Sequence, residues 1–102
     1  MQRKKNLMDY TKENIEKAVC EYFKVEAKDL YHPQKHKYPL GGARDILMYL
    51  LYASGYKVYI IQDWFNVSRA IIYRHLGEVN IALKSGTKIR DDINNINKLL
   101  NK

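Results

Sequence analysis

The stretch Trp64–Leu76 constrains the fold of this chain more than any other part of its 102 residues. Asn66 is a residue type that tolerates the left-handed backbone of a sharp turn. The hydroxyl of Ser68 is suited to cap a helix that starts after it. The stretch therefore predicts the end of one helix, a tight turn and the start of a second helix. We expect Ile72 to be buried against the first helix, with Val79 buried two turns further along.

Four residues of the second helix, Arg69, Ala70, Tyr73 and Arg74, are left on its outer face. A buried turn with a short basic and aromatic outer face is typical of a helix-turn-helix, which places the start of its second helix in the major groove of DNA. We therefore predict a DNA-binding site made of Ser68 and these four residues. The alternative is an ordinary pair of helices at a corner, with arginines that contact only solvent.

The rest of the chain predicts an all-α protein, a compact helical bundle of about five to six helices. Hydrophobic residues make up 46% of the sequence and recur at helical spacing, whereas the chain has only two prolines and five glycines. A chain of this length supports one domain. We assign residues 1–10 to a basic N-terminal tail and residues 11–102 to a single helical DNA-binding domain, with the helix-turn-helix at about residues 57–83.

Local patterns place the other elements. Two prolines and a Gly-Gly pair predict a loop after the first helices, and the most apolar stretch predicts the central core helix. Thr87 is expected to cap the last helix with its side chain. The expected elements are an amphipathic helix from Thr11, a helical turn or two within Val25–Tyr31, a loop over His32–Gly42, the central helix over Arg44–Ala53, the helix-turn-helix, and a final helix after Ser85-Gly86-Thr87.

The net charge of +7 is concentrated in the middle of the chain, because residues 32–90 contain nine Lys/Arg and three Asp/Glu and so supply +6 of it. A basic excess around a predicted recognition helix is expected when the partner is a polyanion. We therefore add Lys35, His36, Lys37 and Arg44 to the predicted DNA-binding site, for contacts with phosphates or with the minor groove. The alternatives are a solvated connector and a generally basic surface.

The sequence contains no pattern typical of an enzyme. It has no glycine-rich phosphate loop, no pairing of a nucleophile with a base and no cluster of metal ligands, so we expect no catalytic residue, no cofactor and no metal site. The nine tyrosines are expected to pack half-buried, with a stacking platform for unpaired bases as the alternative.

The single cysteine, Cys20, excludes a disulfide within the chain and favours a reducing compartment. The N-terminus lacks the apolar run of a signal peptide. The longest apolar run, Ile46–Ala53, is far too short to span a bilayer. We therefore expect a cytoplasmic protein with no membrane partner.

Several segments resemble parts of one known family. They are the first helix, Phe23-x-Val25 with Asp29-Leu30, the run Ala43-Arg44-Asp45-Ile46-Leu47-Met48-Tyr49-Leu50, and Ile89-Arg90-Asp91-Asp92-Ile93 through Leu99. Together they are similar to the C-terminal DNA-binding domain of the bacterial chromosomal replication initiator DnaA, a member of the Trp-repressor-like helical group. The resemblance covers about residues 15–100.

Two base-reading features of that family are replaced here. An arginine near the start of the family's central helix enters the minor groove, and its place falls on or near Gly42. An Asp-His-Thr-Thr run heads the family's recognition helix, and its place falls on Ser68-Arg69-Ala70-Ile71 if the turn is one residue shorter; without that gap, the Asp falls on Arg69. The resemblance therefore implies the same architecture with altered specificity.

The predicted function is sequence-specific binding of double-stranded DNA, in replication initiation or its regulation or as a small transcription regulator. One alternative is a protein-interaction module that keeps the fold but has lost DNA binding, with a replication or regulatory protein as its partner. The other is a binder of single-stranded nucleic acid or RNA through the tyrosines.

Overall fold

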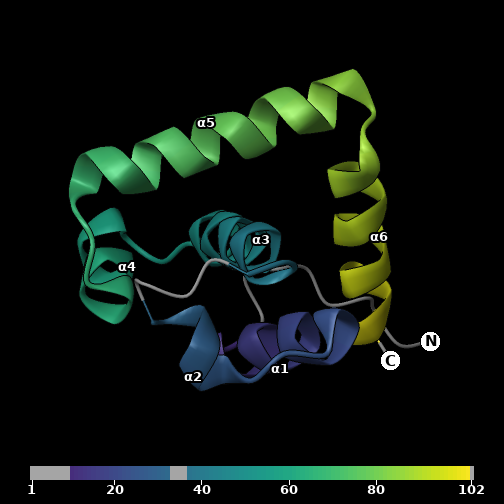
Figure 1. The fold of residues 1–102 in the computed structure, drawn as a ribbon, viewed down its shortest axis with the longest axis horizontal. Coiled ribbons are helices and arrows are strands. Elements are labelled where there is room, and N and C mark those ends of the chain that lie inside the picture. Colours follow the sequence, from purple (N-terminus) through teal and green to yellow (C-terminus); the bar gives the residue numbers. More distant parts are fainter. Residues whose placement is uncertain (1–9, 33–36, 102) are drawn as a thin grey trace.

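The structure is a computed structural model that describes residues 10–32 and 37–101. Within these residues there are six helices and no strand, which confirms the expected all-α bundle. In Figure 1, α3 lies in the middle of the molecule, with α5 above it, α6 and α4 on either side, and α1 and α2 below. The helices are α1 (Lys12–Phe23), α2 (Ala27–Leu30), α3 (Leu40–Ala53), α4 (Val58–Phe65), α5 (Arg69–Ser85) and α6 (Lys88–Leu100).

Helix α3 is the core of the bundle because it is apolar on almost every side. Its residues Ile46, Leu47 and Leu50 have no exposed surface. The helix starts at Leu40, so the predicted loop over residues 32–42 is wrong at its C-terminal end. Two helical glycines cost roughly 1 kcal/mol each relative to alanine, and the burial of Leu40 in the core offsets that cost.

Helix α1 begins as its sequence predicts, with Thr11 and Asn14 forming a reciprocal capping box. Tyr10 was assigned to the basic tail, but its side chain is buried in the core. Its hydroxyl donates a hydrogen bond of 2.8 Å to Oδ1 of Asn101 at the other end of the chain. The packed domain therefore includes Tyr10, and the rest of the predicted tail, residues 1–9, lies outside the described residues.

The corner between α4 and α5 has the geometry that the sequence predicts. Asn66 adopts the left-handed conformation, with φ 53° and ψ 50°, directly after α4. Ser68 precedes α5, and its Oγ accepts a hydrogen bond of 3.3 Å from the backbone N–H of Ile71. Ile72 and Val79 are completely buried, as expected.

The junction between α5 and α6 differs in detail from its prediction. Helix α5 runs to Ser85, two residues beyond the expected end, and Gly86 follows with φ 67°. Thr87 precedes α6, but its hydroxyl donates to the carbonyl oxygen of Ala82 at 3.2 Å instead of capping α6. The predicted side-chain cap is therefore wrong, because the hydroxyl joins the backbone N–H groups of Gly86 and Thr87 in donating to the carbonyl oxygen of Ala82 at the end of α5.

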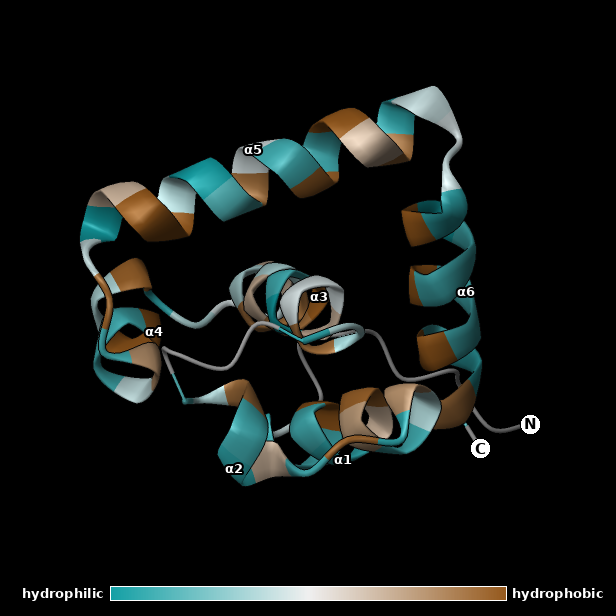
Figure 2. Cartoon of the chain, viewed as in Figure 1, coloured by the Kyte–Doolittle hydropathy of each residue, from teal (hydrophilic) through white to brown (hydrophobic). Residues whose placement is uncertain are grey.

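Helix α6 is amphipathic, and its apolar side is turned toward the centre of the bundle (Figure 2). Ile93 and Ile96 are buried there. Beside them Asp92 is also buried and accepts hydrogen bonds from the Tyr22 hydroxyl at 2.6 Å and from Nζ of Lys88 at 3.0 Å. In the described ranges, none of the helices has the length and apolar character needed to cross a membrane.

Candidate nucleic-acid interface

The first turns of α5 present the predicted reading residues to solvent. Ser68, Arg69, Ala70, Tyr73 and Arg74 are all exposed, whereas the opposite side of the helix is buried in the core. The first turn contains no acidic residue. Ser68 caps the N–H of Ile71, but an exposed helix start still favours an anion, because the helix dipole is positive at that end.

Arg69 lies against the ring of Tyr73. Its Cζ is 5.7 Å from the ring centroid, a distance at which a guanidinium and an aromatic ring attract each other. This contact does not use the N–H groups of the guanidinium as hydrogen-bond donors to a carboxylate or carbonyl. Arg69 is therefore held near the start of α5 with its donors available.

Arg74 is less available than Arg69. Its Nε lies 4.0 Å from Oε1 of Glu78, one turn further along α5. Both side chains are more than half exposed, so this ion pair is weak and a phosphate can compete with it. Arg74 is therefore better suited to binding a phosphate than to recognising a base.

Next to the start of α5 lies a hollow of about 700 Å³, which we call the tyrosine hollow. It is formed where the end of α3, the start of α4 and the start of α5 meet, and no Asp or Glu lines it. Tyr52, Tyr59 and Tyr73 are exposed, although half-buried packing was expected for the tyrosines, and Tyr56 is half-buried. The lining of the hollow includes Tyr52, Tyr56, Lys57, Tyr59, Arg69 and Tyr73.

Arg44 does not belong to an exposed DNA-binding surface, so its prediction is corrected. Its side chain is buried, and only 9% of the residue is exposed. Its Nε donates to the carbonyl oxygen of Leu30 at 2.7 Å, and one terminal nitrogen donates to those of Asp29 and His32 at 3.2 and 2.9 Å. The guanidinium donates to carbonyl groups at the end of α2 and in the following turn, and thus joins α2 to α3.

The predicted basic loop is described only at its C-terminal end. Lys37 is exposed, as a phosphate contact requires. Lys35 and His36 lie outside the described residues.

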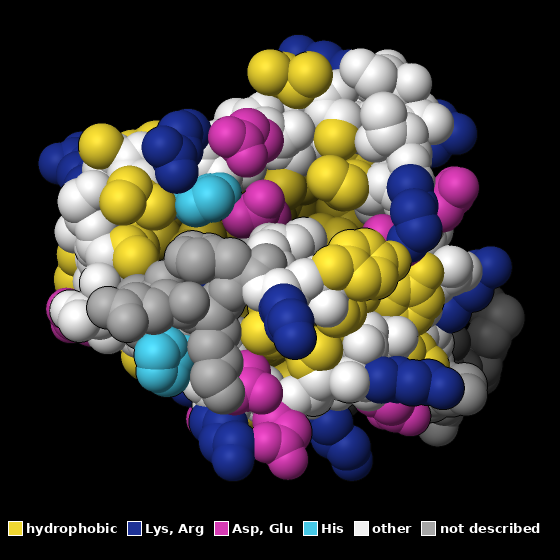
Figure 3. All heavy atoms as spheres, viewed as in Figure 1, with side chains coloured by type: hydrophobic (Ala, Val, Ile, Leu, Met, Phe, Trp, Pro, Cys, Tyr) yellow, Lys and Arg dark blue, Asp and Glu magenta, His cyan; other side chains and the backbone are white. Residues whose placement is uncertain are grey.

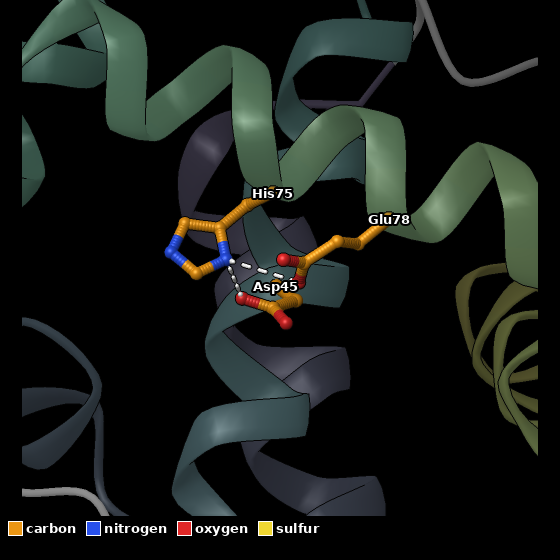
Figure 4. A group of neighbouring side chains, drawn as sticks. All are labelled: Asp45, His75 and Glu78. Atoms are coloured by element: carbon orange, nitrogen blue, oxygen red, sulfur yellow. Dashed lines mark ion pairs between the residues drawn. The ribbon is translucent and has the colours of Figure 1, made fainter.

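A group that the sequence did not reveal joins α3 to α5. Nδ1 of His75 lies 2.6 Å from Oδ1 of Asp45 and 3.8 Å from Oε2 of Glu78 (Figure 4). The nitrogen is buried, and within the described residues it has no partner aligned as a hydrogen bond. The 2.6 Å contact is an ion pair when His75 is protonated. Spacing along the sequence did not indicate the group, because Asp45 comes from α3 and the other two from α5.

This group is more consistent with a link between helices than with a metal centre. The candidate ligand atoms of Asp45, His75 and Glu78 all lie within 4.8 Å of one another. The separation of 2.6 Å between Nδ1 and Oδ1 is nevertheless shorter than two ligands of one metal ion adopt, since each would lie about 2 Å from the ion at a wide angle. Burial raises the pKa of the Asp45 carboxyl above its ordinary value, and the nearby Glu78 carboxylate raises it further, whereas His75 opposes both effects.

The positive charge does not form one continuous patch on the face shown in Figure 3. Lys and Arg side chains are scattered over this face, one of them near its middle and several around its edge, with Asp and Glu side chains among them. Any preference of this protein for a polyanion must come from local groups such as Arg69 rather than from this face as a whole.

Comparison with known proteins found no relative: no model of a known protein family matches the chain, and neither does any curated protein.

Proposed function

We propose that this protein binds double-stranded DNA and that α5 enters the major groove with its first turns. The observation that carries the proposal is the corner between α4 and α5. The left-handed Asn66 and the buried Ile72 fix the angle between the two helices, and the start of α5 beyond them is exposed and free of acidic residues. This is the arrangement that a helix-turn-helix uses to present a recognition helix.

The cations of the proposed interface have different roles. Arg69 lies in the first turn of α5, where a guanidinium with available donors reaches a guanine edge with two hydrogen bonds. Lys37, Lys57 and Arg74 are also exposed and are suited to phosphates, which carry no sequence information. Sequence preference should therefore depend mainly on Arg69.

The resemblance to the DnaA C-terminal domain supports this proposal and places it in a biological context. Helix α3 covers the segment that resembles the family's central helix, and α5 starts at the residues that replace its base-reading run. With other residues in place of the family's base-reading run, we propose a different target sequence and a role in replication initiation, its regulation or transcription. Such a role requires the compartment that holds the DNA, which is the cytoplasm in a bacterium.

Titration of a random-sequence duplex at several salt concentrations tests the proposal. Phosphate contacts by Lys and Arg release condensed counterions, so the logarithm of the affinity should fall linearly with the logarithm of the salt concentration. A slope of about −0.9 for each neutralised phosphate gives the number of contacts. No binding at low salt would reject the proposal and favour the protein-interaction module.

A further inference from the structure

We propose that the tyrosine hollow holds an unpaired DNA base, so that the preferred ligand is a duplex with a single-stranded extension. This inference rests on the proposed function and adds a second site to it. The hollow and the proposed reading residues share two side chains, Arg69 and Tyr73. A strand that leaves the duplex at the start of α5 therefore meets the hollow without a change in the fold.

Aromatic surface is the first observation that points to a base. Tyr52, Tyr59 and Tyr73 are 46%, 66% and 47% exposed, although tyrosine rings are usually half-buried in a packed protein. Proteins that bind single strands present exposed aromatic rings on which successive bases stack. The hollow's volume of about 700 Å³ falls within the range of about 300–1,000 Å³ that is typical of ligand sites.

One wall of the hollow is fixed in place. The Tyr56 hydroxyl accepts a hydrogen bond of 2.8 Å from the backbone N–H of Lys12. Its ring packs edge-on against Trp64, with the two centroids 5.1 Å apart. Because Tyr56 is held from both ends, the hollow is already formed before a ligand arrives, which lowers the entropic cost of binding.

The charges around the hollow suit the phosphate that accompanies a base. Lys57, directly before α4, and Arg69, at the start of α5, both line it, and the lining contains no carboxylate. Helix α4 also starts here, and in the described part of the chain no side chain caps its first turn at Lys57. The N–H of Ile60 donates to the carbonyl oxygen of Lys57 at 3.0 Å, which leaves the N–H groups of Val58 and Tyr59 for a phosphate oxygen.

The test compares three labelled DNA probes at one salt concentration: a blunt hairpin, the same hairpin with a short single-stranded extension, and the extension strand alone. The extension should strengthen binding by roughly 5- to 150-fold for each stacked base, which corresponds to about 1–3 kcal/mol of stacking. A fluorescent base analogue in the extension should change its emission when the protein binds. Equal affinities for the blunt and the extended hairpins would overturn the inference and leave duplex binding intact.

Variants of Tyr59 connect the effect to the hollow. Tyr59→Ala should remove the gain from the extension and leave the affinity for the blunt hairpin unchanged, whereas Tyr59→Phe should keep the gain because it keeps the ring. Tyr38→Ala is the matched control, since Tyr38 is 88% exposed and does not line the hollow. A gain that survives Tyr59→Ala would overturn the inference.

Failure of the proposed function has a different signature. If neither hairpin binds, the proposal of duplex recognition is wrong. Binding of the extension strand alone then tests whether the hollow holds an unpaired base. Binding of that strand that Tyr59→Ala abolishes would support a site for unpaired bases. No binding of any probe would reject both.

Discussion

Nε of Arg44 lies 2.7 Å from the carbonyl oxygen of Leu30, so an arginine from the first turns of α3 closes the end of α2. Two further bonds from the same guanidinium reach the carbonyl oxygens of Asp29 and His32. Burial lowers the pKa of Arg44 below its ordinary value, because the charged group is partly removed from water. Arg44, which the sequence predicted to contact DNA, therefore stabilises the fold.

Arg44→Met should lower the free energy of unfolding by about 2–4 kcal/mol, because three backbone carbonyl groups lose a charged hydrogen-bond donor at a site that is partly removed from water. Arg69→Ala is the matched control: Arg69 is exposed, and a surface substitution of this kind changes stability by roughly 0.5 kcal/mol or less. Urea denaturation of both variants measures the difference. Equal stabilities would show that the Arg44 bonds contribute nothing.

Ile72→Ala should cost about 2–5 kcal/mol, because it removes a completely buried side chain where α5 packs against the core. Ile81→Ala, on the same helix, should change stability little, because Ile81 is 68% exposed. Thermal and urea unfolding of the pair provide the measurement. An Ile72→Ala variant as stable as the Ile81→Ala variant would show that the corner between α4 and α5 is packed differently.

Asp45 gives the protein a specific pH dependence. Burial and the Glu78 carboxylate raise the pKa of Asp45 in the folded state, against the attraction of His75, Arg44 and Arg74. The folded state therefore binds this proton more readily than the unfolded state, in which the pKa is about 3.9. The stability that depends on Asp45 should accordingly fall as the pH rises from about 3.9 through the raised pKa.

Urea denaturation of the wild type and of Asp45→Asn over that pH range measures this effect. The advantage of the wild type over Asp45→Asn should shrink as the pH rises. A wild-type advantage that grows with pH would instead mean that His75 keeps Asp45 charged and lowers its pKa.

The sequence predicted those features that depend on neighbouring residues. The left-handed Asn66, the Ser68 cap and the burial of Ile72 all follow from local spacing and from residue type, and the structure contains all three. The start of α3 was missed because Gly41 and Gly42 favour a loop locally, whereas the burial of Leu40 extends the helix.

Features that depend on the packing of distant segments were not predictable in this way. The tyrosine hollow combines residues of three helices, and the contact between Asp45 and His75 links positions 30 residues apart in the sequence. The residues next to Arg44 in the sequence do not show whether its side chain is buried or exposed. Its burial depends on where α2 ends, and those neighbouring residues do not encode that position.

The most direct test of the proposed function separates the recognition of bases from the binding of phosphates. A preferred duplex is first selected from a random pool, and the affinities of the wild type, Arg69→Ala and Lys37→Ala are then measured for that duplex and for a scrambled one. Lys37→Ala should weaken both duplexes alike and reduce the salt slope by about one. Arg69→Ala should reduce the ratio of the two affinities by roughly 1–3 kcal/mol in free energy, the discrimination lost with one bidentate base contact. A ratio that stays intact in Arg69→Ala would contradict the claim that the first turn of α5 reads DNA through this residue.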